Sequence, residues 1–161
     1  MSTTTTTTIP ITTTGATKKA TISKILVAID GSDASMDAAD YAISISKKYN
    51  AELYALHVIR ADVDLFGQHE TSEFMTRMRS EGEKYLDKVK FKANEKSIQI
   101  KTKMISSINI AGGIVDYAEE NNIDLIVIGT RGRSGFKIKL LLGSVASHVV
   151  TYAHCPVLVV K

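Results

Sequence analysis

The chain has 161 residues, 44% of them hydrophobic and 23% charged, as expected for one soluble globular domain. The formal net charge of +3 includes Lys18 and Lys19 in a segment without acids, so the remainder is almost neutral and a broad nucleic-acid-binding surface is not expected. Cys155 is the only cysteine, which excludes an internal disulfide and fits a reducing compartment. No apolar run approaches the roughly 20 residues that span a bilayer, and no apolar signal core is present, so we expect a cytoplasmic protein without membrane contacts.

Residues 1–21 form a threonine-rich segment that also contains Pro10 and Gly15. Apart from Ile9 and Ile11, no strongly apolar residue alternates with the threonines, so the segment has little to bury. We expect a disordered tail, either a solvated terminus or a substrate for phosphorylation. The folded domain is predicted to cover residues 22–161.

Strand-like and helix-like segments alternate in the order βαβαβαβαβ. A near-continuous apolar run predicts a buried strand over residues 22–29, and residues 30–33 form a turn in which Ser32 or Asp33 can cap a helix. That helix ends near Tyr49; it is followed by a strand over 52–59, a loop-like stretch over 60–70 and a long helix with apolar residues from Phe74 to Val89. Next come an alternating, half-exposed strand over 98–105, a helix ending near 121–122, a strand over 125–128, a helix over 143–152 and a strand over 156–160.

This alternation predicts a single α/β domain with an open, parallel, five-stranded sheet and helices on both faces. In the order 3-2-1-4-5, the first and fourth strands are neighbours at the point where the strand order reverses. Ligands in such sheets bind beyond the carboxyl ends of the strands at this point. Asp30 follows the first strand and Gly129 ends the fourth, so both are expected at one site.

Gly129 opens a glycine-rich segment that continues through Gly132 and Gly143 to Ser144. Glycine lets the backbone approach a ligand closely, and the free N–H groups at a helix start favour an anion. The segment is either a phosphate-binding loop or only a tight strand-to-helix connection. Its basic residues either screen phosphates or are merely solvated; they are Arg131, Arg133, Lys137 and Lys139.

Several short segments are distinctive in combination: residues 24–32 (KILVAIDGS), His57-Val58, residues 124–129 (DLIVIG), the glycine series ending at Gly143-Ser144, and residues 155–160 (CPVLVV). Together they resemble the universal stress protein family over residues 22–161. The resemblance implies an adenine nucleotide alpha hydrolase-like fold. It also implies binding of ATP or ADP, with Mg²⁺ or Mn²⁺ held through the phosphates.

The resemblance also assigns site residues. Asp30 is similar to an acid near the adenosine, although it could instead cap the first helix or brace the following turn. Val58 is similar to the residue whose backbone meets the adenine edge. The ribose and phosphate side would be lined by Ile128, Gly129 and Arg131, and the phosphates would be met by N–H groups of Gly132, Gly143, Ser144, Val145 and Ala146.

The chain departs from the family pattern at a few positions. The nucleotide-binding signature has nine residues between its second and third glycines, whereas ten separate Gly132 from Gly143. An extra residue adds little loop-closure entropy, but it would displace the phosphate cradle if it extends the turn before Gly143. Ala146 lacks a hydroxyl group that some members carry, and Ala28 and Ile29 replace more polar or constrained residues, although their backbone donors persist.

The remaining polar side chains indicate neither a catalytic nor a metal-binding cluster. The four histidines lack metal-ligand spacing, and Ser32 and Ser144 have no base beside them in the sequence. Cys155 precedes an apolar strand, as a packing residue does. We expect His57, at a strand end, to be structural or to lie next to the adenine.

The leading hypothesis is a cytoplasmic stress-response protein that binds ATP or ADP as a sensor or switch. Without a clear general base, we expect at most slow ATP hydrolysis or autophosphorylation. The alternatives are a dimeric interaction module of the same fold that binds no nucleotide, and a nucleotide-dependent enzyme of a related fold. The apolar edge strand at 156–160 would be covered by its two-fold mate, which predicts a homodimer.

Overall fold

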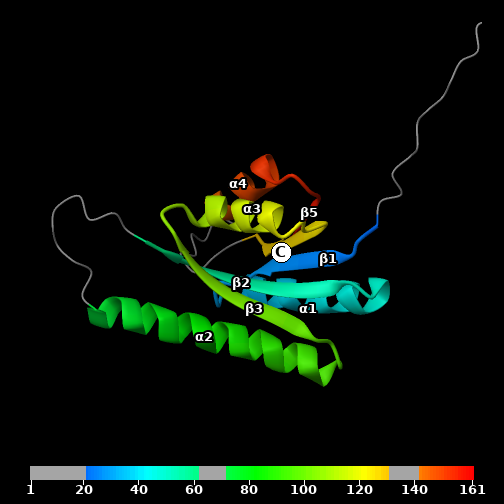
Figure 1. Ribbon diagram of the computed structural model, residues 1–161, viewed down its shortest axis with the longest axis horizontal. Helices are drawn as coiled ribbons and strands as arrows, with labels where there is room; N and C mark the ends of the chain where they lie inside the picture. The colour runs from blue at the N-terminus through cyan, green and yellow to red at the C-terminus, as the bar shows by residue number, and fades with distance from the viewer. Residues whose placement is uncertain (1–20, 62–71, 131–141) are drawn as a thin grey trace, which may run out of the picture.

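Figure 1 shows the computed structural model, which describes residues 21–61, 72–130 and 142–161. Its sheet has parallel strands in the order β3-β2-β1-β4-β5, which confirms the predicted topology. The strands are β1 (Lys24–Ala28), β2 (Glu52–Arg60), β3 (Ile100–Ser107), β4 (Leu125–Gly129) and β5 (Val157–Val160). The helices are α1 (Asp33–Tyr49), α2 (Ser72–Glu95), α3 (Ile110–Glu120) and α4 (Ser144–Tyr152).

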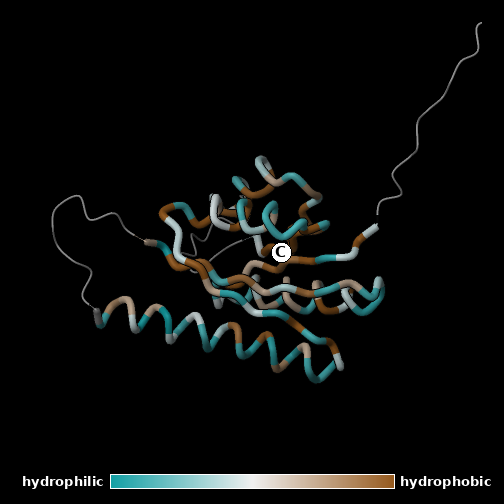
Figure 2. Tube along the Cα trace, in the orientation of Figure 1, coloured by the Kyte–Doolittle hydropathy of each residue, from teal (hydrophilic) through white to brown (hydrophobic). Residues whose placement is uncertain are grey.

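The sheet separates two hydrophobic cores. Side chains of a strand alternate between faces, so Ile25 and Val27 of β1 pack with α1 and α2, whereas Leu26 and Ala28 pack with α3 and α4. The helices accordingly cover opposite faces of the sheet (Figure 1). Hydrophobic residues concentrate along the strands, whereas hydrophilic residues recur throughout α2 (Figure 2). This distribution follows from burial of the central strands on both faces.

The predicted element boundaries differ from the structure most clearly at β3. This strand was predicted over residues 98–105 and is observed at Ile100–Ser107. Ile98 N donates to Ala93 O at 2.9 Å, and Ser97 has a φ of 58°, so these residues close the end of α2 before the strand can begin. β3 lies at an edge of the sheet and pairs with β2, in agreement with its half-exposed pattern.

Three sequence predictions fall largely outside the described residues. These are the disordered tail at 1–21, of which only Thr21 is described, the loop-like stretch that continues beyond Ala61, and the basic residues of the glycine-rich segment. In the described ranges, no helix combines the length and apolar character needed to cross a membrane.

Candidate functional site

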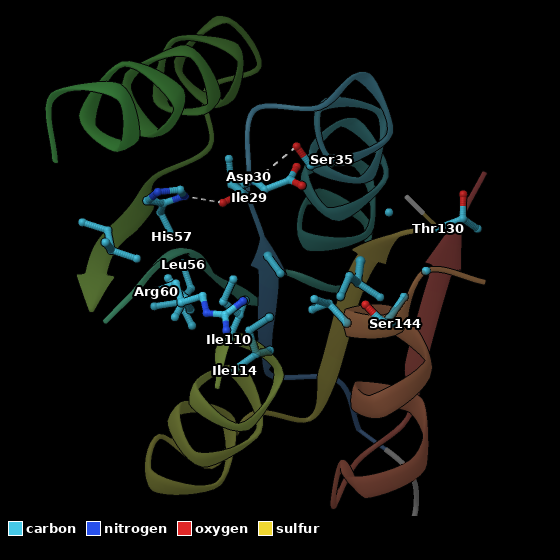
Figure 3. Close-up of a pocket in the computed structure, with 18 of the residues that line it drawn as sticks. Ile29, Asp30, Ser35, Leu56, His57, Arg60, Ile110, Ile114, Thr130 and Ser144 are labelled. Atoms are coloured by element: carbon cyan, nitrogen blue, oxygen red, sulfur yellow. Dashed lines mark hydrogen bonds between the residues drawn. The ribbon is translucent and has the colours of Figure 1, made fainter. Parts of the chain in front are cut away.

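A cavity of about 330 Å³ lies at the carboxyl ends of β1 and β4, where the strand order reverses. Figure 3 shows its walls, most of which come from the ends of β1, β2 and β4, the first two turns of α3 and the first turn of α4. Parallel strands place all their carboxyl ends at one edge, which is why residues distant in the sequence meet here. The structure therefore has a hollow where the sequence predicts a ligand.

All predicted site residues that fall in the described ranges line this cavity. They are Ala28, Ile29, Asp30, Val58, Ile128, Gly129, Gly143, Ser144, Val145 and Ala146. Arg131 and Gly132 lie outside the described residues. The arrangement brings the predicted residues together around one space, and their roles toward a nucleotide stay predictions.

One end of the cavity is apolar. Its walls there include Leu56, Val58, Ile110 and Ile114, with the Arg60 side chain beside the two isoleucines (Figure 3). Of these residues, only Val58 is predicted for the site from the sequence. Ile110 and Ile114 occupy successive turns of α3 at i and i+4, a spacing that could have indicated a shared face but not a face that borders a ligand site. Apolar walls of this kind suit an aromatic base.

Asp30 stabilises the turn between β1 and α1. Its Oδ1 accepts hydrogen bonds from the Ser32 N–H at 3.0 Å and from the Ser32 hydroxyl at 2.6 Å. Ser32 in turn caps α1, because its Oγ accepts the Ser35 N–H at 3.2 Å. The turn-bracing alternative is therefore supported for Asp30, while its place in the cavity wall is compatible with ligand contact.

The opposite end of the cavity adjoins the first turn of α4. The N–H groups of Ser144, Val145 and Ala146 belong to this turn, where no preceding helical carbonyl can accept them. The prediction that the Gly143 N–H meets a phosphate is wrong. Gly143 N donates to Thr130 O at 2.8 Å, so this N–H already has an acceptor within the protein. Its φ of −60° is one that any residue can adopt.

Gly129 has a packing role that the sequence alone does not reveal. A Cβ at this position would lie 2.7 Å from the carbonyl carbon and 2.8 Å from the carbonyl oxygen of Ala34 in α1. Both are backbone atoms of a helix, so they cannot rotate away as a side chain would. The absence of a side chain at Gly129 therefore lets the start of α1 pack closely on the end of β4.

His57 and Cys155 occupy structural environments. The His57 side chain is buried, with Nδ1 placed 2.7 Å from Ile29 O and its ring edge-on to Tyr85. Cys155 is half-buried against the core under α3 and α4, and this burial raises the pKa of its thiol. Within the described part of the chain, no group of three or more acidic, histidine or cysteine side chains could hold a metal ion.

Comparison with known proteins agrees with this architecture. The model of the universal stress protein family matches residues 21–161. The universal stress protein MJ0531 of Methanocaldococcus jannaschii is 43% identical over 140 residues, which are 86% of this chain and 81% of that protein.

Solved structures of similar proteins share the fold. The structure of UspA from Lactobacillus plantarum is 29% identical with a TM-score of 0.79, and the match covers 88% of this chain and 99% of that one. A universal stress protein from Archaeoglobus fulgidus in complex with dAMP is 23% identical with a TM-score of 0.66, covering 86% of this chain and 98% of that one. Other structures of the fold are complexes with cAMP and with AMP. From the match to its family model and its relatives, the chain belongs to the universal stress protein family.

Proposed function

We propose that this protein binds ATP or ADP at the carboxyl ends of β1 and β4 and acts as a stress-response sensor or switch. The observation that carries the proposal is that all described residues predicted for the site line the same cavity. Complexes of related proteins with dAMP, cAMP and AMP support an adenine nucleotide as the ligand class.

The two ends of the cavity suit different parts of a nucleotide. The adenine would lie between Val58 and the isoleucines of α3, and Asp30 would lie near the ribose. The phosphates would meet the first turn of α4, whose N–H groups and helix dipole favour anions. Mg²⁺ or Mn²⁺ would accompany the phosphates as part of the nucleotide complex.

Any ATP hydrolysis should be slow. Efficient hydrolysis needs a general base within hydrogen-bond reach of the attacking water. Among the described lining residues, Asp30 and His57 carry the side chains of the types that most often act as a general base. Asp30 accepts two hydrogen bonds from Ser32, and His57 Nδ1 is engaged by Ile29 O, so both are held in structural contacts.

We also propose a cytoplasmic homodimer. β5 lies at the edge of the sheet and pairs with β4, and Val157, Leu158 and Val159 are half-exposed there. An apolar edge strand of this kind is usually covered, and pairing with the same strand of a second copy would cover it. Light scattering at micromolar concentration should give twice the mass of the 17.5 kDa chain, and a monomeric mass would contradict the proposal.

Calorimetric titration with ATP, ADP, AMP and adenosine, with and without magnesium, tests nucleotide binding. Ser144→Asp provides a sharp variant, because an acid in the first turn of α4 favours the helix but repels a phosphate. We expect it to weaken ATP binding by about tenfold or more while leaving adenosine binding unchanged. Ser147→Asp is the matched control, since Ser147 lies on the same helix but outside the cavity wall.

The outcomes separate the candidate functions. Saturable ATP or ADP binding that is weakened by Ser144→Asp and retained in the control supports the proposal. Absence of binding at millimolar ATP would contradict it and would favour the dimeric interaction module. Turnover faster than about 1 per second would instead favour a nucleotide-dependent enzyme.

A further inference from the structure

The β1–β2 ladder ends at the level of the cavity. Ile29 N donates to Leu56 O at 2.9 Å, and on the other side of β2 Ala61 N donates to Ser107 O at 2.9 Å. Successive residues of a strand direct their N–H and C=O groups alternately to the two neighbouring strands. Val58 shares the direction of Leu56, so its backbone groups point to the side where β1 has just ended.

His57 occupies the acceptor that the next ladder bond would use. Continuing the register beyond the Ala28–Leu56 pair would bring the Val58 N–H to Ile29 O. In the described structure Ile29 O instead lies 2.7 Å from His57 Nδ1, the contact drawn as a dashed line in Figure 3. A carbonyl oxygen can only accept, so Nδ1 carries the proton and donates it.

The ring of His57 is held in this position from the side of α2. A Cβ on Gly82 of α2 would overlap the His57 ring and would lie 2.9 Å from Nε2. Glycine at this position therefore provides the space that the ring occupies. Tyr85, one turn further along α2, meets the ring edge-on at 5.8 Å between centroids. With 6% of His57 exposed, the ring has little freedom to leave the Ile29 carbonyl.

We propose that His57 is a positioning residue for base recognition, an inference that rests on the proposed nucleotide binding. By holding the Ile29 carbonyl on its ring N–H, His57 keeps this carbonyl from turning toward Val58, so β1 does not extend along β2 and the Val58 backbone stays directed at the ligand. The Val58 N–H then donates to N1 of adenine, and the Val58 C=O accepts from the N6 amino group. A 6-oxopurine presents the opposite pattern, an N1–H donor and an O6 acceptor, so the site selects a 6-aminopurine.

The test compares the affinities of ADP and inosine diphosphate by calorimetry. The wild type should prefer ADP. His57→Phe keeps an aromatic ring but loses the donor, so we expect the preference for ADP to fall about tenfold, as for the loss of one hydrogen bond. His57→Asn retains an amide N–H near the Nδ1 position and should restore most of the preference.

The ratio of the two affinities separates positioning from a merely structural role. General loosening of the site would weaken the binding of both nucleotides by the same factor. If the ratio of the ADP affinity to the inosine diphosphate affinity is unchanged in His57→Phe, the inference is overturned even though ADP binds. Failure of the wild type to bind ADP would overturn the proposed nucleotide binding, and with it the role of His57 in base recognition.

NMR of the ligand-free wild type tests the same arrangement without any variant. We expect the ¹⁵N signals of His57 to show the proton on Nδ1, and no through-hydrogen-bond coupling between Val58 N and the Ile29 carbonyl carbon. A proton on Nε2 at neutral charge, or a detectable Val58–Ile29 coupling, would overturn the inference.

Discussion

Gly129→Ala should destabilise the ligand-free protein. The new methyl carbon would lie 2.7 Å and 2.8 Å from backbone atoms of Ala34, well inside van der Waals contact, so α1 would have to shift away from β4. Overpacking of this kind costs about 1–3 kcal/mol of unfolding free energy. At about 2–4 °C per kcal/mol for a chain of this size, a loss of 2 kcal/mol lowers the melting temperature by about 4–8 °C.

Urea denaturation of the nucleotide-free protein measures this effect directly. If glycine were needed at this position only for close approach to a ligand, alanine would stabilise the free protein by about 0.4–1 kcal/mol, because it lowers the entropy of the unfolded chain. The sign of the change therefore distinguishes the two explanations. Gly112→Ala is the control, since its nearest new contact is 3.4 Å and alanine favours the helix. Unchanged or increased stability in Gly129→Ala would refute the packing argument.

Further predictions concern other parts of the structure. Gly82→Ala should destabilise the wild type, because the new methyl group would overlap the His57 ring. In a His57→Ala background the same substitution should stabilise the protein by up to about 1 kcal/mol, because alanine favours the helix. Equal effects of Gly82→Ala in the two backgrounds, measured by urea denaturation, would contradict this prediction. Lys101 Nζ donates to Glu52 at 2.7 Å and lowers the pKa of that carboxyl, so Lys101→Met should raise the Glu52 pKa in an NMR titration. Because the Glu52 pKa is lowered in the folded protein, the ion pair with Lys101 stabilises the fold at pH values above the ordinary Glu pKa of 4.5. This stabilisation is lost as the pH falls through the lowered Glu52 pKa. Burial raises the pKa of Cys155, so its thiol should react with a disulfide reagent at pH 8 more slowly than free cysteine, and an equal rate would argue against burial.

The location of the site could be predicted because it depends on strand order and strand ends. The apolar runs of β1 and β4 mark strands buried on both faces, and the polar or glycine residues that follow them mark where each strand stops. Once the order 3-2-1-4-5 is accepted, Asp30 and Gly129 must lie near each other. This part of the prediction needs no knowledge of side-chain contacts.

Other features depend on contacts between elements far apart in the chain, which a single sequence does not display. The close approach of Ala34 to Gly129 and the overlap of His57 with Gly82 become visible only when the helices are packed on the sheet. In the sequence, Ile110 and Ile114 look like ordinary core residues of a helix, although they line the cavity. Hydrophobic periodicity identifies the buried face of a helix, but it does not tell what that face packs against.

The start of α4 is fixed by the end of β4, and this bears on the additional residue between Gly132 and Gly143. Thr130 N donates to Val160 O at 2.7 Å, which ties Thr130 to β5, and Thr130 O accepts the Gly143 N–H at 2.8 Å. These two bonds place the first turn of α4 relative to the sheet, whatever the length of chain between them. A longer connection therefore need not displace the N–H groups of Ser144 and the residues that follow it. The same bond that removes Gly143 from the set of phosphate donors keeps the remaining donors at the cavity.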